Sequence, residues 1–171
     1  MTRKVLILGP QGSGKSTQGK LLAQFLRLPY ISTGDIFRTM TGKIKQVLYQ
    51  GRLVDDQTTS EIVKKRLNQK DCQNGFVLDG YPRTLEQVKL FDPPIDGVFY
   101  LDLSDTSALN RLLKRGRVDD TPQSIKTRLD LYYKKTKPLL NHYRNLSKLI
   151  EIEASGSIEE VQQRIRDVVN G

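Results

Sequence analysis

A glycine-rich segment near the N-terminus carries the clearest chemical pattern of the chain. Residues 9–17 read GPQGSGKST and follow the apolar run Val5–Leu8. They match G-x-x-x-x-G-K-[ST], in which backbone N–H groups cradle phosphates, the lysine reaches the outer phosphates and the hydroxyl binds Mg²⁺. A plain glycine-rich turn is the alternative, but strand, loop and helix follow in the order that phosphate binding requires. The phosphate-binding residues expected here are Gly12, Ser13, Gly14, Lys15, Ser16 and Thr17.

An acidic residue at the end of another apolar run is the expected partner of this loop. Phe76-Val77-Leu78-Asp79 ends in a carboxylate, as in the Walker-B arrangement, where it holds Mg²⁺ directly or through water. Alternatively, Asp79 only opens the turn before Gly80. Since both segments end strands of one expected sheet, we favour a metal site made by Ser16 and Asp79.

Two arginines lie just after expected strands, where they could bind a second anion beside the phosphates of the glycine-rich loop. Arg38 and Arg83 each lie just beyond an expected strand, and a further basic cluster covers residues 111–117. A phosphoryl group in transfer carries charge on its equatorial oxygens, and arginine binds such oxygens as a bidentate fork. The acidic residues, which are the only candidate bases, have other plausible roles. This favours a phosphate acceptor, which is already ionised, over an alcohol acceptor.

Composition limits the class of protein. The 171 residues are 37% apolar, which fits one domain over residues 1–171, and no apolar run approaches the ~18 residues of a membrane span. With a single cysteine and a single histidine, we expect no disulfide, no zinc site and a cytoplasmic location. The net charge of +9 fits non-specific nucleic-acid binding or a phosphate cleft with solvated helices, and we favour the second interpretation.

Apolar runs alternate with longer amphipathic segments, which predicts an α/β fold with a parallel sheet covered by helices on both faces. The expected strands are Val5–Leu8, Tyr30–Ile31, Phe76–Asp79, Val98–Leu103 and Leu149–Ile152. The expected helices are Lys15–Leu26, Gln57–Lys70, Leu85–Phe91, Thr106–Arg115, Pro122–Tyr143 and Ile158–Val169. Pro138 should bend the longest of them. We therefore predict a P-loop NTPase fold with a five-stranded parallel sheet.

Taken in order, the motifs resemble the adenylate kinase family over nearly the whole chain. The matching segments are KSTQ at 15–18, STGD at 32–35, GRLVD at 51–55, GFVLDGYPRT at 75–84, RVDD at 117–120 and RL at 128–129. The resemblance implies a nucleoside monophosphate kinase that transfers phosphoryl reversibly from Mg·ATP to AMP, giving two ADP.

The resemblance also implies roles for individual residues. The AMP-binding set would be Thr33, Arg38, Gly80, Arg83 and Gln87, with both arginines on the phosphate and the Gln87 amide reading adenine. Arg111 would stack on the ATP base, which the segment around Gly156 would line. The catalytic cations around the transferred group would be Lys15, Arg83, Arg115, Arg117 and Arg128.

Three of these roles have structural alternatives. Gln87 ends the capping-box pattern Thr84-Leu85-Glu86-Gln87, so its side chain could serve the helix instead of a base. Thr33 could merely cap a helix that starts at Gly34. Arg128 could be a plain surface residue of its helix.

The chain also departs from the family pattern. Ser16 replaces the family's usual glycine, and only twelve residues separate Arg38 from Gly51, so a helix of the expected AMP-binding insertion 32–61 is missing or shortened. Residues 115–120 would be a vestigial lid. Either the Arg115–Arg117 turn is the whole lid or another copy of the chain, in a homo-oligomer, covers the cleft.

Two other functions remain open from the sequence. A UMP/CMP kinase has a similar architecture, but Thr33 and Gln87 favour adenine. A nucleotide-gated module on RNA would use the positive charge, yet it would not need Arg38 and Arg83.

Overall fold

The computed structural model describes residues 3–117 and 120–171. Its centre is a five-stranded sheet with the order β2-β3-β1-β4-β5. All four neighbouring pairs are parallel. The strands are β1 (Arg3–Leu8), β2 (Tyr30–Ser32), β3 (Gly75–Asp79), β4 (Gly97–Asp102) and β5 (Leu149–Glu153). The predicted P-loop NTPase fold is confirmed, and each expected strand lies within two residues of its observed bounds.

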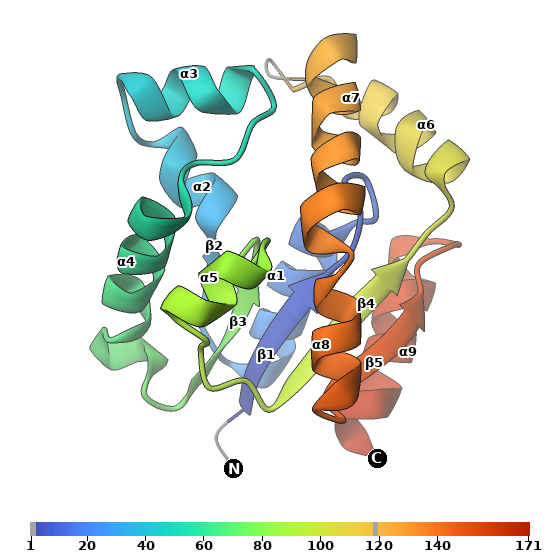
Figure 1. The fold of residues 1–171 in the computed structure, drawn as a ribbon. Helices are drawn as coiled ribbons and strands as arrows, with labels where there is room; N and C mark the ends of the chain where they lie inside the picture. Colours follow the sequence, from blue (N-terminus) through green and yellow to red (C-terminus); the bar gives the residue numbers. More distant parts are fainter. Residues whose placement is uncertain (1–2, 118–119) are drawn as a thin grey trace.

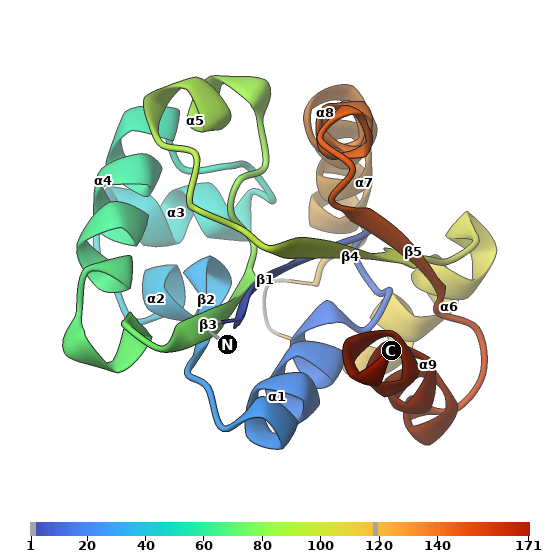
Figure 2. The ribbon, with the colours of Figure 1, turned by 90° about the horizontal axis from the view of Figure 1, so that it is seen from below.

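Helices cover both faces of this sheet, as Figure 2 shows. One face carries α1 (Lys15–Leu26), α6 (Asp105–Arg115) and α9 (Ile158–Asn170). The other carries α4 (Asp56–Leu67), α5 (Leu85–Leu90), α7 (Pro122–Leu131) and α8 (Leu139–Asn145). Because neighbouring residues of a strand point to opposite faces, Leu6 and Leu8 join one apolar core while Val5 and Ile7 join the other.

The register of the strands places the chemistry at one rim of the sheet. Asp79 pairs with Ile7 of β1 on one side and with Ser32 of β2 on the other. The glycine-rich loop after β1 and the turns after β2 and β3 therefore leave the sheet side by side.

Polar side chains start the helices that follow these turns. Ser32 accepts a hydrogen bond from the Asp35 N–H, and Thr84 accepts one from the Gln87 N–H. Thr121 likewise caps α7, and Ser157 forms a capping box with Glu160 at the start of α9. Among the described residues, no helix has the length and apolar content needed to cross a membrane.

Two parts of the helix prediction differ from the structure. The expected helix 122–143 is divided into α7, a π-helical turn over Tyr132–Thr136 and α8. Pro138 has no N–H to donate, and the wider turn, with Lys137 N–H bonded to the Tyr132 carbonyl, ends one helix before the next begins.

The second difference lies between β2 and α4, where α2 (Thr33–Arg38) and α3 (Lys43–Tyr49) stack beside α4 (Figure 1). The expectation of a missing helix in this segment is therefore only partly met, since two short helices fit there. Helix α3 was not expected from the sequence, because it buries no residue and begins after Gly42 without a side-chain cap.

Candidate functional site

A cleft of about 480 Å³ opens at the carboxyl rim of the sheet. Its floor is the glycine-rich loop with Lys15, and Asp79 also lines it. The arginines that line it are Arg38, Arg52, Arg83, Arg111, Arg115, Arg117 and Arg128. All arginines proposed from the sequence as site residues thus lie around one space, although they come from five different segments of the chain. Such a concentration of positive charge suits a ligand with several phosphates.

The glycine-rich loop takes the backbone conformation that its glycines allow. Gly12 and Gly14 have φ values of +85° and +93°. A Cβ at Gly12 would lie 2.4 Å from the carbonyl oxygen of Ala108, so the loop can pack on α6 only with glycine there. Lys15 Nζ donates hydrogen bonds to the carbonyl oxygens of Gly9 and Pro10, at 2.7 and 2.6 Å. The lysine thereby closes the loop around the anion site.

The ammonium group of Lys15 lies among protein atoms and other cations. Burial lowers its pKa from 10.5 to about 8; the Asp79 carboxylate opposes this shift, and Arg83 and Arg115 add to it. A bound phosphate would supply the negative charge that this environment lacks, and so would favour the protonated amine.

Asp79 receives two side-chain hydrogen bonds. Ser16 Oγ donates to Asp79 Oδ2 at 2.9 Å, and the Tyr30 hydroxyl donates to the same oxygen at 2.7 Å. Burial, and then the charge of Asp79, raise the pKa of Tyr30 well above its ordinary value, so the phenol remains a donor.

Ser16 and Asp79 form a donor set that fits Mg²⁺. A hydroxyl and a carboxylate are hard oxygen ligands, and Mg²⁺ typically binds few protein groups and takes its other ligands from water and phosphates. The rest of the described chain offers no cluster of three or more His, Cys, Asp or Glu side chains able to hold a metal. The oxygen pair therefore suits a metal that arrives with a nucleotide.

On the other side of the cleft, hydrogen bonds tie the segment after β3 to α2. Thr33 Oγ1 and Arg83 Nε both donate to the Gly80 carbonyl oxygen, each at 2.9 Å. The carbonyl oxygen of Arg83 accepts from Thr136 Oγ1 at 2.8 Å. Thr33 is the first residue of α2, whose cap is Ser32, so the alternative that Thr33 only caps this helix is wrong.

Gln87 uses one end of its amide to hold this segment. Its Oε1 accepts from the Arg83 N–H at 2.7 Å, while its own N–H donates to the Thr84 hydroxyl. The capping box expected at Thr84 is thus only partly formed, because the Gln87 side chain bonds the N–H of Arg83 instead of that of Thr84.

Thr33, Gly80 and Gln87 line a smaller pocket that adjoins the main cleft. Both spaces share Gly34, Leu48, Arg52 and Arg83 in their walls. The remaining walls of the smaller pocket are Phe37, Leu53, Val54 and Thr59. A largely apolar pocket beside a set of arginines suits a base joined to a phosphate.

Arg38 lies at the more exposed edge of the cleft. Its guanidinium forms an ion pair with Asp35 at 2.5 Å, with 36% of the arginine side chain exposed. Burial lowers the pKa of Arg83; the charge of Asp79 opposes this shift, and the charges of Arg128 and Arg38 add to it. A phosphate bound beside these three arginines would add charge-assisted hydrogen bonds.

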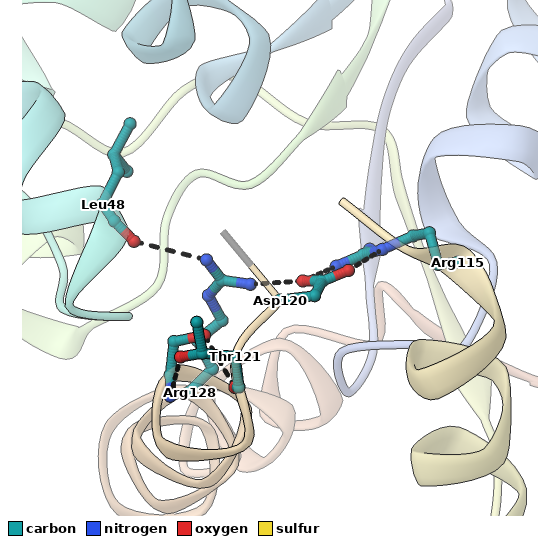
Figure 3. Close-up of polar contacts among 6 residues, drawn as sticks. Leu48, Arg115, Asp120, Thr121 and Arg128 are labelled. Carbon is teal, nitrogen blue, oxygen red and sulfur yellow. Dashed lines mark hydrogen bonds and ion pairs between the residues drawn. The ribbon is translucent and has the colours of Figure 1, made fainter. Parts of the chain in front are cut away.

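Figure 3 shows how one carboxylate organises two further arginines. Asp120 accepts two hydrogen bonds from Arg115, at 2.8 and 2.7 Å, and one from Arg128 at 2.8 Å. Burial alone would raise the pKa of Asp120, but the hydrogen bonds and charges of both arginines outweigh it and hold the pKa below its ordinary value. Asp119, which precedes it in the sequence, lies outside the described residues.

Arg111 lies at the far end of the cleft. Its guanidinium donates to the carbonyl oxygens of Ala154 and Gly156, at 3.0 and 3.4 Å. The residue proposed to stack on the donor base and the segment proposed to line that base are therefore in contact.

The structure adds residues that the sequence reasoning missed. In the sequence, Tyr30 is only the start of an expected strand, and no neighbouring residue indicates its contact with Asp79. Arg52 belongs to the matching segment 51–55, which implies no role for it, yet it lines both spaces. Thr136 bonds the backbone of Arg83 across fifty-three positions, and no local pattern signals such a contact.

Comparisons with known proteins agree on one family. The family model described as adenylate kinase matches residues 7–148. Similar proteins named adenylate kinase include one from Corynebacterium aurimucosum, 40% identical over 94% of this chain and 96% of that protein. One from Oenococcus oeni is 38% identical over 99% of both chains, and one from Bifidobacterium longum is 43% identical over 95% of this chain and 97% of its own. The chain therefore belongs to the adenylate kinase family.

Proposed function

We propose that this chain transfers a phosphoryl group reversibly from Mg·ATP to AMP, giving two ADP, and that the residues around the cleft divide this task as follows. Family membership supports the reaction. The observation that supports the assignment of residues is that two sets of anion-binding groups face one cleft. The first is the glycine-rich loop with Lys15, and the second is Arg38 with Arg83.

The donor side would bind the triphosphate through the backbone of the glycine-rich loop. Lys15 is already held at the mouth of that loop by two carbonyl oxygens, so it is placed to bridge the outer phosphates. Bound between Ser16 and Asp79, Mg²⁺ would offset the negative charge of the phosphate oxygens. Arg111, on the carbonyls of Ala154 and Gly156, would cover the donor base.

The acceptor side would hold AMP with its phosphate on Arg38 and Arg83 and its base in the smaller pocket. Gln87 Oε1 is bonded to the Arg83 N–H, which leaves Nε2 as the atom that would read adenine N1. Gln87 would thus hold the backbone of Arg83 with one atom of its amide and contact the base with the other. Its structural role and its proposed role in reading adenine are therefore compatible.

The remaining arginines would stabilise the transferred group. Arg115 and Arg128 share the Asp120 carboxylate, which holds both cations in place. Arg117, which also lines the cleft, would complete this set. Cations held in place before the reaction need no reorganisation as charge shifts to the equatorial oxygens. Since the AMP phosphate is already ionised near neutral pH, no general base is required.

The segment that would close the cleft is short in this chain. We propose that residues 32–61 form the AMP-binding insertion and residues 115–120 form the vestigial lid. Leu48 and Gly51 of the insertion contact α7 directly, which supports a part for the insertion itself in covering the cleft. Cover by a second copy of the chain is the other candidate.

A coupled assay of ADP formation from Mg·ATP and AMP tests the proposed function. Lys15→Ala and Arg83→Ala should each lower kcat/KM by at least ~100-fold, as expected for groups that stabilise transferred charge. The exposed Lys89→Ala and Arg144→Ala serve as matched controls and should retain activity. Wild-type protein without ADP formation, or alanine variants with unchanged rates, would contradict the proposal.

Two further measurements separate the alternatives. CMP, UMP and dAMP tested beside AMP should be poorer acceptors, and a preference for CMP or UMP would show a UMP/CMP kinase. ATP hydrolysis without AMP should be far slower than transfer, and equal rates would mean that the cleft does not close. Full activity in a strictly monomeric species, by size-exclusion chromatography with light scattering, would exclude cover by a second copy.

A further inference from the structure

Asp79 is held by a residue that the mechanism above does not use. Tyr30 is the first residue of β2, the strand next to β3, and its hydroxyl reaches across to the carboxylate that ends β3. Among the described residues, the side-chain hydrogen bonds to Asp79 come from Tyr30 and Ser16, at 2.7 and 2.9 Å, and both end on Oδ2. The other oxygen, Oδ1, is thereby left as the one available to a ligand in the cleft.

The ring of Tyr30 is fixed by its surroundings. A Cβ at Gly19 would lie 2.6 Å from Tyr30 Cε2, so the ring packs where α1 has no side chain. Glycine inside a helix costs about 1 kcal/mol relative to alanine, and this close contact is a physical reason for it. Lys20 Nζ lies 5.8 Å from the ring centroid on the solvent side. The ring therefore has little freedom to turn its hydroxyl away from Asp79.

We propose that Tyr30 is a positioning residue for the metal site: its hydroxyl fixes the Asp79 carboxylate so that Oδ1 faces the metal that accompanies the donor nucleotide. This inference rests on the proposed function. Ser16 also donates to this carboxylate and can keep that bond while its lone pairs bind the metal, so Tyr30 is the one of the two donors that does not itself line the cleft. Tyr30 approaches from the strand side and can keep its hydrogen bond while the site is filled. Groups that orient a metal ligand in this way commonly change metal affinity by about 10- to 100-fold when removed.

The test compares Tyr30→Phe with the wild type, because phenylalanine keeps the ring against Gly19 and removes only the hydroxyl. The affinity for a non-hydrolysable ATP analogue is measured by calorimetry with Mg²⁺ and with EDTA. In the wild type, Mg²⁺ should strengthen binding. We call the ratio of the affinity with Mg²⁺ to the affinity with EDTA the Mg²⁺ gain. In Tyr30→Phe the Mg²⁺ gain should fall about tenfold, while the affinity in EDTA should stay within about twofold of the wild type.

Tyr133→Phe is the matched control, since Tyr133 also donates its hydroxyl to an aspartate, Asp105, and does not line the cleft. Its gain from Mg²⁺ should equal that of the wild type. Asp79→Asn should abolish the gain, and Tyr30→Phe added to it should cause no further loss if Tyr30 acts through Asp79.

Each result has a distinct meaning. An unchanged gain in Tyr30→Phe, or an equal loss of affinity with and without Mg²⁺, would overturn the positioning role and leave the proposed function in place. A wild-type chain that forms no ADP and gains nothing from Mg²⁺ would overturn the metal assignment and the inference together. Circular dichroism of each variant shows whether the fold is kept.

Discussion

Arg128 of α7 donates a hydrogen bond to the carbonyl oxygen of Leu48 at 3.3 Å, across eighty positions of the chain. Leu48 lies in the last turn of α3, so this contact joins the segment proposed to bind AMP to the helix that carries a proposed catalytic arginine (Figures 1 and 3). The same arginine is bonded to Asp120. A movement of α3 would therefore shift Arg128 at the proposed transfer site. This contact links the binding of the acceptor to the positions of the arginines.

Gly51 allows a second contact between the same segments, and its substitution should weaken AMP binding. A Cβ at this position would lie 2.5 Å from the Ser124 carbonyl oxygen of α7. Gly51→Ala should therefore push the segment away from α7 and raise KM for AMP about tenfold, with KM for ATP nearly unchanged. Steady-state kinetics with each nucleotide varied in turn measures both values.

The control for this variant is Gly42→Ala. Gly42 has almost the same φ, +70° against +71° for Gly51, but no atom lies within 4 Å of its added Cβ. Both variants place a Cβ on a residue of positive φ, and only Gly51→Ala adds the collision. Equal kinetic effects in the two variants would mean that strain alone, and not contact with α7, is responsible.

Asp120→Asn should lower both stability and activity. Only 2% of the Asp120 side chain is exposed, and its loss of charge leaves Arg115 and Arg128 close together without their shared counterion. Since both arginines keep some exposure, we expect a loss of about 1–3 kcal/mol in the free energy of unfolding, below the usual cost of breaking a fully buried pair. Urea unfolding at pH 7 measures this loss.

The pH dependence of this loss follows from the lowered pKa of Asp120. Its stabilising effect is complete above the ordinary aspartate pKa of about 3.9 and is lost as pH falls through the lower native value. Wild type and Asp120→Asn should therefore converge in stability toward acid pH. Glu151→Gln, which breaks the exposed pair with Arg144, should change stability by less than ~1 kcal/mol at pH 7. A constant difference at all pH values would disprove the electrostatic explanation.

Much of the fold is predictable from the sequence because its signals are local. Apolar runs bounded by turns reveal the buried strands. Lys15–Leu26 has the predicted bounds because a glycine-rich loop precedes it and Arg27, two residues before Pro29, ends it in the left-handed conformation. Helix α3 lacks such signals, since none of its residues is buried and no side chain caps its start. The π-helical turn before Pro138 depends on how two helices continue past a proline, which residue pattern alone does not specify.

The candidate site is predictable to a different extent. Arg38, Arg83 and Asp79 follow strand ends, and a parallel sheet brings such residues to one rim. The contacts of Tyr30 with Asp79 and of Arg128 with Leu48 depend on side-chain directions and on packing between distant segments. Spacing along the chain carries no information about such contacts.

The hydroxyl of Thr33 should matter for AMP more than for the fold. Its bond partner, the Gly80 carbonyl oxygen, keeps a second donor in Arg83 Nε when the hydroxyl is removed. Thr33→Val should therefore cost only about 1 kcal/mol in stability but raise KM for AMP several-fold, because the pocket loses a polar group. Thr33→Ser keeps the hydroxyl and should restore most of the affinity. If serine and valine behave alike, the methyl group and not the hydroxyl is what the pocket requires.

The low pKa of Lys15 predicts that ATP binding takes up a proton in mildly alkaline solution. With a pKa of about 8 in the ligand-free protein, most Lys15 side chains are neutral at pH 9. A bound triphosphate favours the charged amine, so binding at pH 9 should take up close to one proton, against a small fraction at pH 7. The affinity should accordingly fall by up to tenfold for each pH unit above 8. Calorimetry in two buffers of different ionisation enthalpy measures the uptake.

Lys15→Arg provides the control for this titration, because arginine stays charged throughout the range. If this variant binds ATP at all, its affinity should show no decline between pH 8 and 9.5 beyond that of the nucleotide itself. The proton uptake at pH 9 should disappear with the lysine. Uptake that persists in Lys15→Arg would assign the titration to another group of the cleft, and an absence of uptake in the wild type would mean that Lys15 is already charged before ATP arrives.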